Sequence, residues 1–189
     1  MIAILPLRKG SKRLKNKNIL RINKLMLYEY ILKTLSSCKK IKKIIISTDF
    51  DFFFKRKFKK KIILHKRPKN LRGNCNMNMV ILDVIDSYHF YNDQGFIQVH
   101  ATSPLIKKES LDRGIYQFKK DKKFDSLFSV TCSQRRIWRI LKNKIKPFNH
   151  NLKDDPTTQN LENLYEENSG FYIFSKKSFM NNFNRIGKK

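Results

Sequence analysis

Acidic residues, alanine and cysteine are scarce in this sequence. Its 189 residues contain 15 Asp and Glu against 42 Lys and Arg, which gives a formal net charge of +27 at pH 7. Alanine occurs only at positions 3 and 101, whereas Lys, Asn, Ile and Phe abound, as expected when an AT-rich genome biases codon choice. Because Cys38, Cys75 and Cys132 lack C-x-x-C spacing, neither a disulfide framework nor a structural zinc site is indicated.

Long hydrophobic runs and linkers are missing as well. No apolar run approaches the roughly 18 residues that span a bilayer, and the apolar start of the chain is too short for a secretory signal peptide. The sequence has no internal repeat and no Gly/Ser-rich linker, and its 40% hydrophobic content is sufficient for one core. These features predict a single-domain cytoplasmic protein with reduced thiols and no membrane partner.

The shortage of acidic residues leaves a strongly basic chain. A net charge of +27 attracts polyanions and predicts non-specific binding to nucleic acid at low salt. However, no zinc-finger, RRM or KH pattern is present, and a run such as residues 55–61 is most simply solvated helix or loop charge. We therefore expect no specific nucleic-acid partner. A non-catalytic basic module that binds nucleotides or nucleic acid is the alternative function.

Hydrophobic patterning predicts strands that alternate with helices. Helical stripes run through residues 28–35 and 77–88, and a third helix is expected after Pro104. The alternation predicts an α/β fold with a largely parallel sheet and helices on both faces. Asp49, at the end of the second strand, is expected to cap a helix that follows it. The expected strands are residues 2–6, 43–48, 62–65, 96–100, 126–132 and 170–174.

The beginning of the chain is its most informative segment. An apolar run at residues 2–7 is followed by a loop rich in basic residues at 8–18, which is typical of a buried strand that opens into an anion-binding loop. The spacings of the Walker loop and of the dinucleotide-binding fingerprint are both absent, and a solvated basic turn is the plainer interpretation. Residues 47–49 and 100–103 also lie at the carboxyl ends of expected strands, so these segments can converge on one crevice.

The residue types in this loop suit a phosphate chain. Gly10 allows the backbone to approach a ligand closely, and Ser11 and backbone N–H groups can donate to phosphate oxygens. Arg8, Lys12 and Lys17 supply charge-assisted hydrogen bonds, each worth about 1.5–3 kcal/mol when desolvated. The loop therefore predicts a triphosphate ligand.

Residues 5–18 read Leu-Pro-Leu-Arg-Lys-Gly-Ser-Lys-Arg-Leu-Lys-Asn-Lys-Asn. This run resembles the signature P-x-R-x-G-S-K-x-x-x-x-K-N of the acylneuraminate cytidylyltransferases, the enzymes that make CMP-sialic acid and related CMP-nonulosonates. Four further segments resemble the same family in the same order, namely residues 46–49, 67–78, 101–105 and 158–174. The similarity therefore covers nearly the whole chain.

The resemblance implies a three-layer Rossmann-like nucleotidyltransferase fold with a mostly parallel central sheet and a protruding dimerisation arm. Residues 1–189 would form one cytidylyltransferase domain, and the polar stretch at about 134–168 would be the arm of a homodimer. Trp138 would anchor this arm, although a lone tryptophan is more often part of a core.

The implied reaction is attack by the anomeric hydroxyl of a nonulosonic acid on the α-phosphorus of CTP, which yields a CMP-sugar and pyrophosphate. CMP-Kdo and CMP-pseudaminate synthetases are the nearest alternatives. Arg8, Lys12 and Lys17 are the implied catalytic residues because they would hold the triphosphate, and Asn18 would help to read the cytosine. The nucleotide-binding residues implied by the motif match are Arg8, Gly10, Ser11, Lys12, Lys17, Asn18, Arg67 and Asn74.

The sugar site is implied less directly. His100 stands where the family often carries glutamine and would face the sugar, although a single histidine more often makes a structural hydrogen bond. Thr157 replaces an arginine that the family commonly directs at the sugar carboxylate of the neighbouring subunit. The implied sugar-binding residues are His100, Thr102, Ser103, Gln159 and Tyr172.

A metal ion is implied by the family but not by these residues. Family members normally continue past the strand at residues 171–174 into a segment whose D-x-D pair binds Mg²⁺. No D-x-D lies beyond residue 174, and Asp49 with Asp51 stands in the wrong segment. We therefore expect Mg²⁺ as the cofactor with its ligands in a missing C-terminal segment, and a fragment rather than an inactive protein, because the other motifs show no decay.

Overall fold

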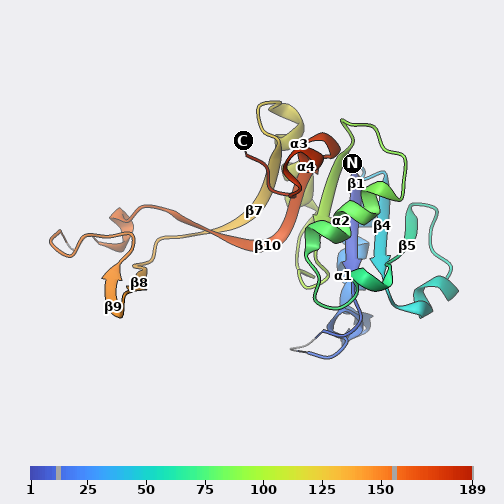
Figure 1. Cartoon of the computed structure of the whole chain (residues 1–189), viewed down its shortest axis with the longest axis horizontal. Coiled ribbons are helices and arrows are strands. Elements are labelled where there is room, and N and C mark those ends of the chain that lie inside the picture. Colours follow the sequence, from blue (N-terminus) through green and yellow to red (C-terminus); the bar gives the residue numbers. More distant parts are fainter. Residues whose placement is uncertain (12–13, 155–156, 189) are drawn as a thin grey trace. The chain divides into compact units, whose positions relative to one another are not determined.

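The computed structural model describes residues 1–11, 14–154 and 157–188 of the chain (Figure 1). The chain forms two compact units: Met1–Phe128 together with Ser169–Lys189 is the first, and Ser129–Asn168 is the second. The strands are β1 (Ile2–Leu7), β2 (Arg21–Ile22), β3 (Leu25–Met26), β4 (Lys43–Thr48), β5 (Ile62–Lys66), β6 (Gly95–Val99), β7 (Ser126–Ser133), β8 (Trp138–Leu141), β9 (Lys144–Pro147) and β10 (Leu164–Ser175). The α-helices are α1 (Leu27–Ser37), α2 (Met77–Asp86), α3 (Lys108–Lys120) and α4 (Lys176–Asn182).

Four short 3₁₀ helices complete the described elements. They are η1 (Lys17–Ile19), η2 (Asp51–Lys55), η3 (Lys69–Leu71) and η4 (Thr158–Asn160). None of the helices in the described parts of the chain is long and apolar enough to cross a membrane.

The first unit is built on a six-stranded sheet in the order β5-β4-β1-β6-β10-β7. β1 pairs in parallel with both β4 and β6, β4 pairs in parallel with β5, and β10 pairs antiparallel with β6. The predicted α/β fold with a mostly parallel sheet is therefore confirmed. β1 is buried along its whole length, which explains why its sequence is a continuous apolar run rather than an alternating one.

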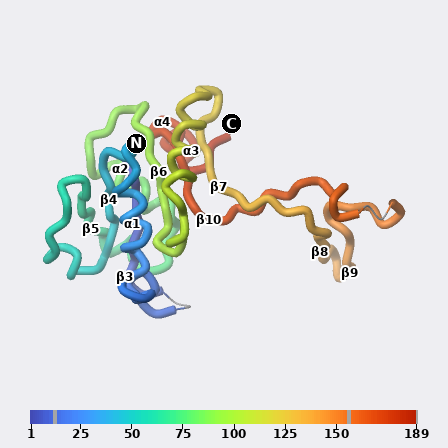
Figure 2. Tube along the Cα trace, turned by 180° about the vertical axis from the view of Figure 1, so that it is seen from behind, coloured from blue at the N-terminus to red at the C-terminus, as the bar shows by residue number. Residues whose placement is uncertain are grey.

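Helices cover both faces of this sheet. Figure 1 shows α2 in front of the strands, and Figure 2, from behind, shows α1 and α3 on the opposite face. One core cluster joins α1 and α3 to residues such as Leu5, Ile46 and Ile173, and the other joins α2 and α4 to Ile4, Ile45 and Phe174. Because side chains alternate across a strand, neighbouring residues of each strand enter different cores.

The neighbouring strands β1 and β6 separate at the carboxyl edge of the sheet. Pairing between β1 and β6 ends at Ile4 and Gln98, whereas pairing between β1 and β4 continues to Leu7 and Thr48. Pro6 lies beyond the last β6 pair, where the missing N–H of proline costs no hydrogen bond to that strand. The order of strands reverses here as well, since β4 lies on one side of β1 and β6 on the other. Open α/β sheets bind ligands at such a switch point.

The second unit contains a β8–β9 hairpin, η4 and the adjoining ends of β7 and β10. Its residues 129–168 include the range expected for the arm. Patterning did not predict the hairpin. Trp138 is 48% exposed, so the interpretation of this tryptophan as a core residue is wrong. Its ring packs against that of His150 in a T-shaped arrangement, with 5.1 Å between the ring centroids.

Candidate functional site

A pocket of about 250 Å³ opens at the carboxyl edge of the sheet, within the first unit. Its walls come from the segments that follow β1, β5 and β6 and from the start of α2. The lining residues are Pro6, Arg8, Ser11, Lys17, Asn18, Arg67, Gly73, Asn74, Cys75, Met77, His100, Ala101 and Thr102. The sequence-predicted crevice is therefore present, and most of the residues predicted for it share this pocket.

The pocket is positively charged. Arg8, Lys17 and Arg67 line it, and none of its lining residues in the described parts of the chain is acidic. Three cations around a small concave volume produce a strong local potential that attracts a polyanion. Ser11 is 9% exposed and adds a hydroxyl that can donate to an oxygen of the ligand. This combination of groups suits a phosphate chain.

The loop after β1 is held by backbone geometry and by Asp49. Gly10 has φ +73°, a left-handed conformation that disfavours other residues, and its Cα hydrogens face open space. The backbone N–H of Lys9 donates to Asp49 Oδ1 at 2.6 Å, and Asn18 Nδ2 donates to the Arg8 carbonyl oxygen at 3.1 Å. The prediction that Asp49 caps a helix is wrong, because Phe50 occupies the cap position of η2. Asp49 instead accepts a hydrogen bond from the loop after β1.

A second loop closes the pocket through Arg8. The Arg8 guanidinium donates through Nη1 to the carbonyl oxygen of Gly73 at 2.6 Å and to Asn74 Oδ1 at 3.3 Å. Gly73 has φ +68°, so the turn that brings its carbonyl toward Arg8 requires a left-handed residue. The motif loop and the segment around Asn74 are therefore joined by Arg8, whose partner Gly73 is 65 residues away in the chain, and both segments line the pocket.

Arg67 is the most deeply buried cation of the pocket, with 1% of its surface exposed. Its Nη2 donates to the Ser47 carbonyl oxygen at 3.0 Å, and its Nε lies 3.5 Å from Ser47 Oγ. Burial lowers the pKa of the guanidinium, while the nearby Asp49 carboxylate acts in the opposite direction. Arginine stays charged even so, and a cation with little water around it attracts an anion strongly.

The residues predicted for the sugar are distributed differently. His100 and Thr102 line the pocket, and the backbone N–H of Ser103 closes a turn on the His100 carbonyl oxygen at 3.2 Å. Tyr172 is fully buried in β10, with its ring 6.4 Å from that of His100 and stacked under the Arg185 guanidinium at 3.6 Å. Gln159 belongs to η4 of the second unit.

Two predicted residues of the motif loop are not among the residues that line the pocket. Gly10 shapes the loop but is absent from the pocket wall, and Lys12 lies outside the described residues. The roles assigned to these side chains by motif match remain predictions.

Sequence reasoning placed residues 47–49 at the crevice but missed the role of Ser47 and Asp49, which hold other residues of the pocket in position. Ser47 and Asp49 end β4, where they hold Arg67 and the backbone of Lys9. Their position at the end of a parallel strand was visible in the sequence, but their partners come from distant segments, so their supporting role was not.

A metal site is not formed by these residues. Within the described parts of the chain, no group of three or more His, Cys, Asp or Glu residues is arranged to hold a metal ion. The described lining residues supply cationic, amide, hydroxyl, imidazole and thiol groups but no carboxylate, and carboxylates are the protein ligands that usually hold Mg²⁺. The expectation of Mg²⁺ stays a prediction, and its ligands are not among the described residues.

The sequence profile of a protein family described as Cytidylyltransferase matches residues 2–188. The chain belongs to the cytidylyltransferase family. The match includes the pocket, the sheet that carries it and the second unit. An enzyme of this family uses CTP.

Similar proteins agree with this membership. The chain is 25% identical over 195 residues to Post-translational flagellin modification protein B of Campylobacter coli, with 96% of this chain and 80% of that protein covered. The structure of 4-diphosphocytidyl-2C-methyl-D-erythritol synthase from Anaerococcus prevotii superposes with a TM-score of 0.69 and 15% identity, over 96% of this chain and 72% of that one.

A second similar structure is CMP:2-keto-3-deoxy-manno-octonic acid synthetase, which was solved in complex with CTP. It gives a TM-score of 0.63 and 14% identity, over 96% of this chain and 76% of that one. Both similar structures establish the fold of this chain as that of nucleotidyltransferases.

Proposed function

We propose that this cytidylyltransferase transfers CMP from CTP to a nonulosonic acid of the sialic type, with pyrophosphate as the second product. The observation that carries the proposal is the pocket at the switch point, where Arg8, Lys17 and Arg67 face one small volume without a lining carboxylate among the described residues. Membership of the cytidylyltransferase family supports CTP as the nucleotide.

In the proposed reaction, the anomeric hydroxyl oxygen of the sugar forms a bond to the α-phosphorus of CTP. The bond from that phosphorus to the oxygen bridging to the β-phosphate breaks, its electron pair leaves with pyrophosphate, and the hydroxyl proton is released. Arg8 and Lys17 hold the triphosphate and stabilise the charge that develops on the leaving group. Lys12 is proposed to act with them on the basis of the motif match.

The other polar lining residues are proposed to contact either the cytidine of CTP or the acceptor sugar. Asn18, Arg67 and Asn74 are proposed to border the cytidine, and His100 with Thr102 to face the acceptor sugar. CMP-Kdo and CMP-pseudaminate synthesis are the alternatives, because these acceptors share the carboxylate and keto-acid core of sialic acid. The name of the Campylobacter coli relative refers to flagellin modification and does not separate these acceptors.

We also propose that the protein works as a homodimer whose second unit supplies the contact between subunits. The β8–β9 hairpin of that unit exposes large apolar side chains, including Ile140 at 72% and Ile145 at 68%. Surfaces of this kind mark protein interfaces in monomeric structures.

Nucleotide specificity is tested by thermal unfolding with added ligands in the presence of Mg²⁺. We expect CTP to raise the melting temperature because it binds the folded state, and we expect ATP and duplex DNA at physiological salt to leave it unchanged. The acceptor is then identified from pyrophosphate release with CTP and a panel of sialic, Kdo and pseudaminic acids. Tight duplex binding together with no effect of CTP contradicts the proposal and supports the non-catalytic basic module.

A further inference from the structure

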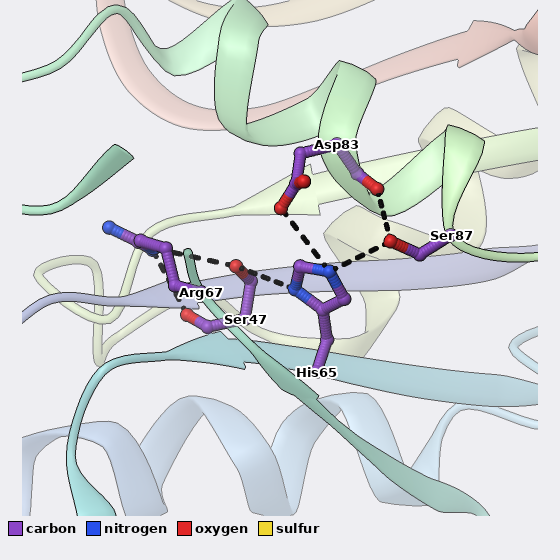
Figure 3. A network of polar contacts seen from close by, with 5 residues as sticks. All are labelled: Ser47, His65, Arg67, Asp83 and Ser87. Atoms are coloured by element: carbon purple, nitrogen blue, oxygen red, sulfur yellow. Dashed lines mark hydrogen bonds and ion pairs between the residues drawn. The ribbon is translucent and has the colours of Figure 1, made fainter. Parts of the chain in front are cut away.

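A chain of polar groups runs from the end of α2 to the pocket; its members Ser47, His65 and Arg67 are buried, Asp83 is partly buried and Ser87 is exposed. Figure 3 shows its five side chains, with His65 at the centre between Ser47 and Arg67 on one side and Asp83 and Ser87 on the other. His65 is 6% exposed, its Nδ1 lies 3.2 Å from Ser47 Oγ, and its Nε2 lies 3.2 Å from Ser87 Oγ. Arg67 Nε lies 3.5 Å from the same Ser47 oxygen, so His65 and Arg67 share one hydroxyl.

The hydrogen bonds of this chain have a fixed direction. Ser87 donates its only hydroxyl proton to the Asp83 carbonyl oxygen at 2.6 Å, so its oxygen accepts from His65. Nε2 of His65 therefore carries the ring proton, and in a neutral imidazole Nδ1 is then an acceptor. Ser47 donates its proton to Nδ1, which leaves the lone pairs of its oxygen directed at the Nε–H of Arg67.

The surroundings of His65 keep its imidazole neutral. Burial lowers the pKa of His65, the Asp83 carboxylate raises it and the Arg67 guanidinium lowers it further. Asp83 Oδ2 is buried 3.3 Å from Nε2 without a hydrogen bond, so its effect is electrostatic. The other group facing the ring is Tyr88, at 6.1 Å between centroids, and the pKa of its hydroxyl is raised by burial, which keeps it uncharged.

We propose that His65 is a positioning residue that acts through Ser47 to fix the orientation of the Arg67 guanidinium in the nucleotide pocket. The inference rests on the proposed function, in which Arg67 borders CTP. Among the described residues, the hydrogen bonds of the Arg67 guanidinium all go to Ser47, so the other N–H groups of that guanidinium are available to a ligand. His65 itself is absent from the pocket wall.

Protonation of His65 opposes this arrangement. An imidazolium carries a proton on Nδ1 as well, so Ser47 must turn its own proton away and accept from His65, where it competes with Arg67 for the same oxygen. The new positive charge also repels Arg67. Burial holds the pKa of His65 in the folded protein below its unperturbed value of about 6.5. Folding stability is therefore intact above about pH 6.5 and declines as the pH falls below it, whereas CTP affinity declines only at the lower pH at which His65 of the folded protein takes up a proton.

The test compares two substitutions that each keep one half of the imidazole. The amide oxygen of His65→Asn can replace Nδ1 as the acceptor for Ser47, whereas the amide of His65→Gln reaches the place of Nε2 and leaves Ser47 without an acceptor. CTP affinity is measured by titration calorimetry on the full chain at pH 8 with Mg²⁺. We expect His65→Gln to bind CTP about 5- to 10-fold more weakly than the unsubstituted protein, and His65→Asn to recover most of that loss.

The substitution of Ser47 provides a second, independent measurement. Ser47→Ala keeps the backbone carbonyl that accepts from Arg67 and removes only the hydroxyl link, so it should weaken CTP binding about as much as His65→Gln. Adding His65→Gln to Ser47→Ala should then cause no further loss, because both act through one contact. His89→Gln changes an exposed histidine just beyond α2 and should leave CTP affinity unchanged.

The pH series gives a readout that a purely structural histidine does not change. As the pH is lowered from about 8 to about 5.5, the CTP affinity of the unsubstituted protein should fall relative to that of His65→Asn. Protonation of CTP itself affects both proteins equally, so it cancels in the ratio of the two affinities. Equal CTP affinities of the Asn and Gln variants, or fully additive losses with Ser47→Ala, overturn the inference. Failure of the unsubstituted protein to bind CTP instead overturns the proposed function, so the two failures are distinguishable.

Discussion

At the scale of single residues, the pocket is divided between side chains that face the ligand volume and side chains that hold them. Arg8 and Lys17 belong to the first group, and each comes from the loop that follows β1. Asp49 and Ser47 belong to the second, since they bind the Lys9 backbone and the Arg67 guanidinium. Substitutions in the first group should therefore change ligand affinity more than folding stability.

Lys17→Ala tests this division. Lys17 lines the pocket and is partly exposed, so we expect it to contribute a charge-assisted contact to the triphosphate and little packing. CTP affinity measured by calorimetry should fall about tenfold, whereas the free energy of unfolding measured with urea should change by no more than about 0.5 kcal/mol.

Lys15→Ala is the matched control, because it removes the same charge from an exposed position of the same loop that does not line the pocket. Its CTP affinity should stay close to that of the unsubstituted protein. Equal losses of affinity in the two variants would mean that only the overall charge of the loop matters.

At the scale of elements, the close approach of α3 to the sheet depends on Gly114. A Cβ at this position would lie 2.8 Å from Cε2 of Phe171 and 3.2 Å from Cδ1 of Ile173, both of which belong to β10. Phe171 and Ile173 are buried in the same core cluster as α3, so a shift of either side chain disturbs its neighbours in that core. α3 begins at Lys108, shortly after the segment with His100, Ala101 and Thr102 that lines the pocket.

Gly114→Ala should destabilise the protein even though alanine favours helices. The better helix propensity of alanine stabilises the folded protein by about 1 kcal/mol. Overpacking of the new methyl group against Phe171 costs about 1–3 kcal/mol, and we expect this second effect to be larger. Urea unfolding measures the difference.

Combining Gly114→Ala with Phe171→Leu removes the aromatic ring edge and should restore part of the loss, since the two positions are in contact. A gain in stability from Gly114→Ala alone would show that the ring moves aside at little cost.

At the scale of the whole molecule, the second unit carries a two-stranded hairpin with one apolar face. Trp138 and Ile140 of β8 pair with Pro147 and Ile145 of β9, and these four residues share that face. Two-stranded hairpins are marginally stable in water when nothing covers them. A second copy of the chain is the partner that we propose for this face.

Light scattering coupled to size-exclusion chromatography tests the assembly. We expect the unsubstituted chain to elute as a dimer, and Ile140→Asp with Ile145→Asp to shift the equilibrium toward monomer, with a dissociation constant raised at least about tenfold. Lys146→Ala, on the opposite face of the hairpin, serves as the control and should remain dimeric. A monomeric unsubstituted chain would contradict the proposal.

Sequence patterning predicted the sheet well and the connections poorly. β1, β4, β5, β6 and β7 lie within a residue or two of the expected ranges, because each is a short apolar run between turns or polar residues. β10 begins at Leu164, well before the expected residue 170, since its first half is polar and exposed and carries no hydrophobic signal. The β8–β9 hairpin was missed for a different reason: its few alternating apolar residues lie in two strands of four residues each, within a stretch that is otherwise polar.

For the site, the motif loop and the segments after β5 and β6 were found from residue type and from resemblance, and the pocket brings them together. The helix-capping role of Asp49 was wrong because its partner, the Lys9 backbone, is 40 residues away. Local sequence rules assign an Asp before a helical segment to the cap of that helix. Only the parallel pairing of β1 with β4 shows that Asp49 lies beside the motif loop.

The sequence by itself determined the α/β class, the buried strands and the cationic loop, because these follow from hydrophobic period and from the charge of neighbouring residues. The tertiary structure alone decided that Ser47, His65 and Arg67 form one chain of hydrogen bonds beneath the pocket. Their contacts join β4 to β5 and α2, and such pairings depend on strand order and register, which no short segment of sequence encodes.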